Sequence, residues 1–116
     1  MTQPDEATNW LWQRAETYLQ VGLTERAECL LLLAHHRAPA HPGILWDLAR
    51  AFLANDQASR CLTSLDALTE QMPEWLSPSS VLLLRIRALQ QLQQTAQARQ
   101  QLQDYFAAQE RTSHAP

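Results

Sequence analysis

The fold is decided by one stretch of the chain, Tyr18-Leu-Gln-Val-Gly22-Leu-Thr-Glu-Arg-Ala27-Glu-Cys-Leu-Leu31-Leu-Leu-Ala34-His-His-Arg-Ala-Pro39. Gly22 can adopt the left-handed backbone conformation that closes a helix, and Thr24 is a good N-cap for a following helix. A proline disfavours helical geometry in the residue before it, so the second helix must end before Pro39. The stretch therefore predicts a helix end, a tight turn and a complete second helix.

The residue pattern of this stretch recurs 34 residues further along the chain. The matching positions are Leu11, Trp12, Ala15, Tyr18, Leu19, Ala27, Leu31 and Pro39 in the first copy and Leu45, Trp46, Ala49, Phe52, Leu53, Cys61, Leu65 and Pro73 in the second. A third copy starts about three residues late and aligns Ala98 with Ala27. We therefore expect one domain, residues 1–116, with repeats at about 8–41, 42–75 and 79–112.

Each repeat is expected to contain two helices. The expected helices cover about residues 4–21, 24–37, 42–54, 56–71, 78–92 and 95–109. Asp56 is the expected N-cap of the fourth helix, and the fifth is expected to start at Ser77 and Pro78. The tail 110–116 lacks apolar periodicity, so we expect it to be disordered.

The period and the residue pattern resemble the tetratricopeptide (TPR) family. The first repeat carries the pattern of that family most fully, at Leu11, Ala15, Tyr18, Gly22, Ala27, Leu31, Ala34 and Pro39. The second repeat has Asp56 where glycine is usual, and the third has Gln93 there and no closing proline. The resemblance implies an all-α fold in which three TPR-like helix pairs stack as a short right-handed solenoid.

A narrower resemblance rests on Leu-Gln-x-Gly-x-x-Glu-Arg-Ala-x-x-Leu-Leu over residues 19–31 and on the stretches 87–92 and 98–99. These stretches are similar to the YscY family, whose members are small cytosolic chaperones of bacterial type III secretion. The resemblance implies that the chain binds a small exported partner, YscX-like, as a heterodimer. It also implies delivery of that partner to the cytosolic domain of the export gate at the inner membrane.

Two alternatives remain open. The chain also resembles the needle-subunit co-chaperones of the YscG family, which are short TPR proteins of the same secretion system. From a different class, it could be a structural TPR adaptor that associates with itself through its outer face.

Composition and charge favour a cytoplasmic protein. The net charge is −3, which does not suggest a nucleic-acid partner. The acidic, polar N-terminus does not resemble a signal peptide, and the apolar runs are too short for direct insertion into a membrane. Cys29 and Cys61 lie within helix patterns without a CxxC motif, so we expect two buried thiols in a reducing compartment.

In a TPR stack, the first helix of each pair lines the inner, concave face. The side chains one helical step from the packing stripe turn toward that face. The predicted partner-binding residues are Trp12, Glu16 and Leu19 from the first repeat, Trp46, Arg50 and Leu53 from the second, and Leu83 and Arg87 from the third. Because large apolar residues recur in this row, we expect an apolar groove that receives a partner segment. The alternative is that these residues pack on one another within the chain.

The sequence offers little support for catalysis. It has no glycine-rich phosphate loop, no nucleophile elbow and no carboxylate pair in a recognisable context, so we expect neither an enzyme nor a cofactor. His35 and His36 are adjacent on a helix and point about 100° apart, so we expect no metal site there. The chain has no lysine, which argues against the carboxylate clamp by which other TPR proteins hold an acidic C-terminus.

Overall fold

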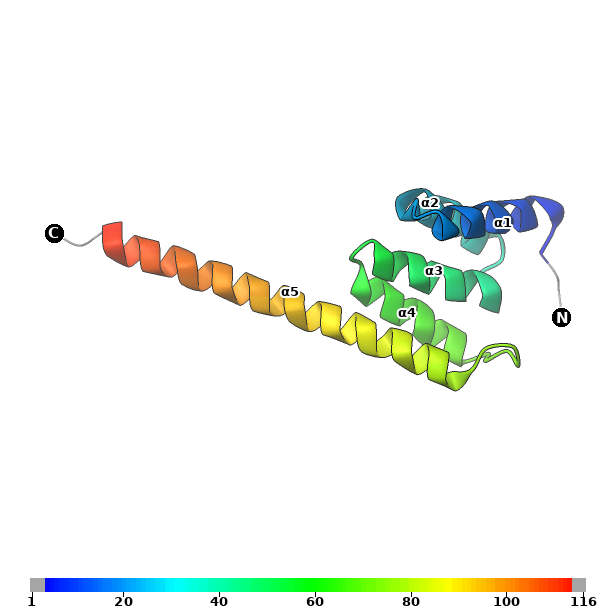
Figure 1. Cartoon of the computed structure of the whole chain (residues 1–116). Helices are drawn as coiled ribbons and strands as arrows, with labels where there is room; N and C mark the ends of the chain where they lie inside the picture. Colours follow the sequence, from blue (N-terminus) through cyan, green and yellow to red (C-terminus); the bar gives the residue numbers. More distant parts are fainter. Residues whose placement is uncertain (1–3, 114–116) are drawn as a thin grey trace.

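A computed structural model describes residues 4–113 of the protein, and all regular structure in this range is helical (Figure 1). The elements are α1 (Glu6–Gln20), α2 (Thr24–Arg37), α3 (Pro42–Ala54), α4 (Ala58–Thr69) and α5 (Pro78–Ser113). The expected all-α class is confirmed. The helix count is five within the described residues, where the sequence predicted six.

The first four helices form two hairpins, and the turn within the first hairpin is nearly identical to the turn within the second. Gly22 has φ +83° and lets the N–H of Leu23 donate to the carbonyl of Tyr18 at 2.9 Å. In the second turn, Asp56 adopts the left-handed conformation with φ +60°. The N–H of the next residue, Gln57, donates to the carbonyl of Phe52 at 2.8 Å. An aspartate tolerates this conformation better than most residues, which explains how the second turn forms without glycine.

Two predicted N-caps are wrong. The cap of α2 is Leu23 and the cap of α4 is Gln57, and neither side chain makes a capping hydrogen bond. Thr24 is the first residue of its helix, and Asp56 lies in the turn because its backbone is needed there in the left-handed conformation. The predicted start of α5 is confirmed, since the Ser77 hydroxyl accepts the N–H of Ser80 at 3.1 Å.

The core lies between the hairpins. In the first hairpin α1 packs on α2, in the second α3 packs on α4, and α2 packs on α3. The equivalent residues of the two hairpins are all fully buried: Ala27, Leu31 and Ala34 in α2, and Cys61, Leu65 and Leu68 in α4. Burial raises the pKa of the Cys61 thiol to about 11, so this cysteine is a packing residue. The prediction of a buried Cys29 is wrong, because its position on α2 is exposed.

The third helix pair is not formed, because the predicted helices 78–92 and 95–109 are one continuous helix, α5. Residues 92–95 contain no glycine, proline or other strong helix terminator. Thr95 does not cap a new helix, since its hydroxyl donates to the carbonyl of Gln91 at 3.0 Å in the preceding turn. Residues 110–113 are also helical, so disorder is wrong for them, and residues 114–116 lie outside the described range.

The two halves of α5 have different environments. Residues 78–92, the anchored half, pack on α4 and α3, where Arg85 pairs with Asp66 at 2.8 Å and Gln91 donates to the carbonyl of Leu53 at 3.2 Å. Residues 93–113, the projecting half, extend away from the hairpins (Figure 1), and every side chain described from 93 to 111 is exposed. The molecule is therefore elongated, with extents of 71 × 27 × 23 Å.

Ending the chain after Gln94 is expected to change the free energy of unfolding by less than about 1 kcal/mol, because only exposed side chains are removed. Leu84→Ala in the anchored half should cost about 2 kcal/mol or more, since that side chain is only 9% exposed. Urea unfolding followed by circular dichroism measures both. A truncated chain that unfolds far more easily than the full chain would contradict this division of α5.

Candidate protein-binding site

A buried carboxylate links the two helices that carry most of the predicted partner-binding residues. Asp47 of α3 is 4% exposed, and its Oδ2 accepts the indole N–H of Trp12 from α1 at 2.7 Å. Its Oδ1 accepts from the guanidinium of Arg50 at 3.2 Å. Asp47 was not among the residues predicted for the site, although a lone acid in the mostly apolar stretch 44–53 is a signal that its carboxylate has a partner.

The indole of Trp12 is also fitted against the backbone of α3. A Cβ atom at Gly43 would lie 2.3 Å from Cζ2 of the indole, so only glycine permits this approach. The ring of His41 meets the indole edge-on, with 4.7 Å between the centroids. The N–H and part of the ring of Trp12 therefore make contacts within the chain.

The remaining residues of the predicted row divide into two groups. Leu19, Trp46 and Leu53 are partly buried and pack against the core. Leu83 is 54% exposed, and Arg50 and Arg87 are exposed as well. Leu83 on α5 is therefore the most exposed apolar side chain of the row.

The row has a polar centre between α1 and α3. Burial raises the pKa of the Glu16 carboxyl, and a hydrogen bond with Asp47 and the charge of Asp47 raise it further, while Arg50 acts in the opposite direction. Two carboxyl groups and one guanidinium therefore interact on this face. A partner that covered them would have to satisfy their polar atoms.

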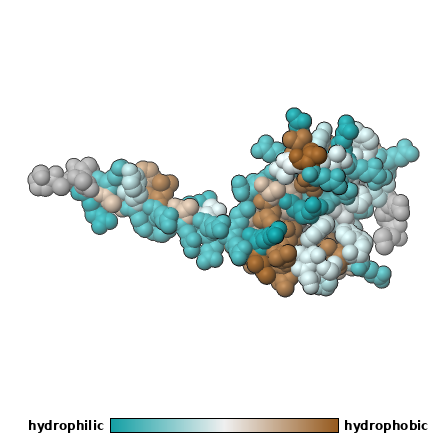
Figure 2. Space-filling model, in the orientation of Figure 1, coloured by the Kyte–Doolittle hydropathy of each residue, from teal (hydrophilic) through white to brown (hydrophobic). Residues whose placement is uncertain are grey.

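α5 carries the largest concentration of exposed apolar side chains among the described residues. In the anchored half, Leu82, Ile86 and Leu89 follow helical spacing and are 58%, 43% and 52% exposed. In the projecting half, Leu102 and Phe106 are each 55% exposed. Figure 2 shows hydrophobic surface on the projecting part as well as on the body of the molecule.

The exposed pair on the projecting half continues a stripe that is buried in the anchored half. Leu102 and Phe106 follow Leu84 and Ala88 by five helical turns, about 18 residues, so the two pairs lie on the same side of α5. Leu84 and Ala88 are covered, at 9% and 0% exposure. The stripe therefore extends past the end of the hairpins, where no described part of the chain covers it.

No family model matches the chain, and no curated protein matches it in sequence. Within residues 4–113, no helix combines the length and apolar character needed to cross a membrane, and no cluster of three or more His, Cys, Asp or Glu side chains could hold a metal ion. The molecule is an all-helical protein with two packed hairpins and a long fifth helix whose apolar side chains are largely uncovered.

His41 makes the stability of this region depend on pH. Its Nδ1 accepts the N–H of Ile44 at 3.3 Å and so caps α3, and burial lowers the pKa of His41. Protonation of Nδ1 removes the cap. The folded pKa lies below the unfolded value of about 6.5. The contribution of His41 to stability is therefore fully present above about pH 6.5 and is lost as the pH falls from there through the folded pKa.

We expect the wild-type chain to lose about 1 kcal/mol of unfolding free energy, the usual contribution of a helix cap, as the pH falls below the unfolded pKa of about 6.5, and His41→Asn to lose less. Asparagine supplies a cap that does not titrate. Glu16 acts in the opposite sense, since its raised pKa favours folding at lower pH, so the two proteins must be compared at each pH. Urea unfolding measures the free energy of unfolding of both proteins at each pH. If the difference between the two proteins is the same at every pH, the capping role is contradicted.

Proposed function

We propose that this protein is a TPR-type binding module whose incomplete third repeat is covered by a partner chain. Two sets of exposed apolar side chains on α5 carry the proposal. Leu82, Ile86 and Leu89 lie on the anchored half, and Leu102 and Phe106 lie on the projecting half. Burying a leucine or isoleucine side chain contributes about 1.5–3 kcal/mol, so covering this row provides a large driving force.

Within this class, we infer that the protein is a cytoplasmic chaperone of bacterial type III secretion, similar to the YscY family. It would hold a small YscX-like export substrate as a heterodimer and bring it to the export gate at the inner membrane. The mechanism is non-covalent burial of an apolar segment without nucleotide. Support comes from the resemblance over residues 19–31 and from the exposed apolar surface of α5.

The binding surface in this proposal is centred on α5. Leu83 and Arg87 of the predicted row are exposed on its anchored half, beside Leu82 and Ile86. Trp46, Leu19 and Leu53 can contribute only the part of each side chain that the core leaves open.

Affinity capture from the source bacterium tests the proposal. We expect the tagged wild-type chain to retain one exported component of a type III secretion system, identified by mass spectrometry. Recovery of the needle subunit would instead support the YscG-like alternative. Recovery of nothing but further copies of the chain, with sedimentation showing a stable oligomer, would overturn the chaperone proposal in favour of the self-associating adaptor.

A further inference from the structure

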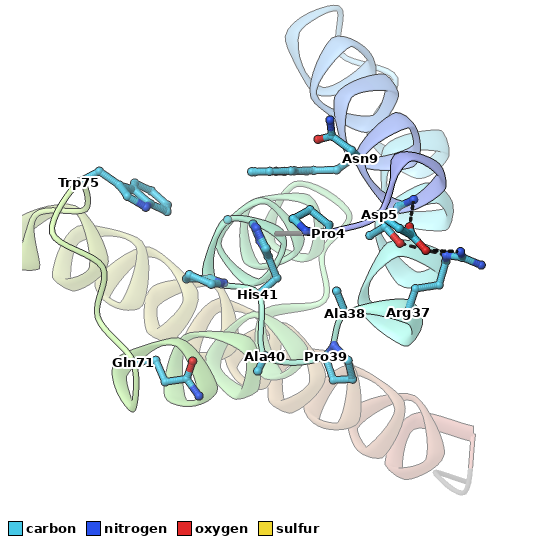
Figure 3. A pocket seen from close by; sticks show the side chains of 14 residues that line it. Pro4, Asp5, Asn9, Arg37, Ala38, Pro39, Ala40, His41, Gln71 and Trp75 are labelled. Atoms are coloured by element: carbon cyan, nitrogen blue, oxygen red, sulfur yellow. Dashed lines mark hydrogen bonds and ion pairs between the residues drawn. The ribbon is translucent and has the colours of Figure 1, made fainter. Parts of the chain in front are cut away.

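A cavity of about 770 Å³ lies at the end of the hairpins opposite the projecting half of α5. It is open to solvent on one side and is lined by the start of α1, the turn between α2 and α3, and the loop before α5 (Figure 3). Its volume falls within the range typical of ligand sites, about 300–1,000 Å³. None of the partner-binding residues predicted from the sequence lines it except Trp12.

Three aromatic side chains line this cavity. Trp75 stands on one side with 61% exposure, and Trp12 and His41 form an edge-to-face pair on the other walls. In the view of Figure 3, the lining residues His41 and Pro4 lie between Trp75 and the ion pair of Asp5 and Arg37. A solvent-exposed tryptophan facing other rings across a cavity is a suitable surface for stacking a ligand.

The charged groups of the cavity are already paired. The Nη2 of Arg37 lies 2.8 Å from Oδ2 of Asp5, and its Nε donates to the buried hydroxyl of Thr8 at 3.0 Å. Hydrogen bonds from Thr8, assisted by Arg37, lower the pKa of Asp5 to about 2, so the carboxylate stays ionised. Because Arg37 and Asp5 neutralise each other, the cavity has little net charge and favours a neutral ligand.

Three polar side chains of the cavity have no hydrogen-bond partner within residues 4–113. They are the amides of Asn9 and Gln71 and the indole N–H of Trp75. The indole N–H of Trp12, by contrast, is used by Asp47. The cavity thus offers the N–H donors of Asn9, Gln71 and Trp75 to a ligand with free acceptors, and the two amide oxygens can still bond to water.

We propose that this cavity binds a proline-rich segment of a partner in the polyproline II conformation. Such a segment has no internal hydrogen bonds, so its carbonyl groups are free to accept from Asn9, Gln71 and Trp75. Its proline rings are rigid and apolar, and aromatic-lined grooves bind them at low entropic cost. A helical segment fits less well, because its carbonyls are already occupied. The site is separate from α5 and does not depend on the chaperone proposal.

The test uses the full chain and a fluorescein-labelled peptide of ten prolines, with a Gly-Ser peptide of equal length as the peptide control. We expect saturable binding of the proline peptide by fluorescence anisotropy and at least tenfold weaker binding for Trp75→Ala, about what loss of a stacked aromatic residue causes. Trp10→Ala is the matched control, because Trp10 is 57% exposed on α1 and does not line the cavity. It should bind within about twofold of wild type.

Gln71→Ala provides a second variant at an exposed position, and it should also weaken binding of the proline peptide. Ile86→Glu on α5 should leave the peptide affinity unchanged, which separates this site from the chaperone surface. Equal affinity for the Gly-Ser peptide, equal losses in Trp75→Ala and Trp10→Ala, or no saturation at millimolar peptide would each overturn the proposal.

Discussion

Gly43→Ala is expected to lower the free energy of unfolding by about 1–3 kcal/mol, the usual cost of forcing an extra methyl group into a packed contact. The new Cβ would lie 2.3 Å from Cζ2 and 2.6 Å from Cη2 of Trp12, which is closer than atoms can approach. The indole must therefore move, and its 2.7 Å hydrogen bond to the buried carboxylate of Asp47 is lost or distorted. An unsatisfied buried carboxylate adds to the cost. Urea unfolding followed by circular dichroism and tryptophan fluorescence measures the change.

A double-mutant cycle shows whether the contact with Trp12 is the cause. Trp12→Leu removes the indole, so adding Gly43→Ala to it should cost clearly less than Gly43→Ala does in the wild-type chain. Equal costs in the two backgrounds would show that the loss arises elsewhere. A Gly43→Ala chain as stable as wild type would contradict the close packing of α1 on α3.

The triple variant Leu82→Glu, Ile86→Glu and Leu89→Glu is expected to weaken partner binding by more than about 100-fold, because burying each of these side chains contributes about 1.5–3 kcal/mol. Its own stability should change little, since the three side chains are 58%, 43% and 52% exposed. Co-purification with the captured partner, followed by titration of the purified chains, measures the affinity. Circular dichroism reports whether the variant stays folded.

The matched control adds the same charge to the same helix. Gln93→Glu, Gln97→Glu and Gln100→Glu lie on the same side of α5 as the triple variant but replace side chains that are already polar and exposed. This control should bind within a few-fold of wild type. If both variants lose binding equally, charge on α5 is responsible and apolar burial is not.

The sequence predicted the first four helices well because their signals are local. Gly22 ends α1, Pro42 begins α3, and the 34-residue spacing places Cys61 and Leu65 on the buried side of α4 as Ala27 and Leu31 are on α2. The third pair was predicted by extending the repeat. That extension failed because a repeat pattern does not end a helix by itself, and residues 92–95 contain no residue that does.

The candidate site was less predictable, because it depends on contacts between helices that are distant in sequence. The helical step from the packing stripe places Trp12 and Glu16 on one face of α1. It could not show that the indole crosses to Gly43 and Asp47, 31 and 35 positions further on (43 − 12 and 47 − 12), since that contact requires the relative position of α1 and α3. The open apolar surface of the projecting half was missed because residues 95–109 were expected to form the second helix of a third pair.

Hydrogen exchange of the chain alone and of its captured complex tests the central claim most directly. Because the projecting half of α5 is uncovered, the backbone amides of residues 93–113 should exchange fast in the free chain and become strongly protected when the partner is bound. The amides of α3 and α4 should be protected in both states. Strong protection of residues 93–113 in the dilute free chain, or no gain of protection anywhere on α5 in the complex, would contradict the account.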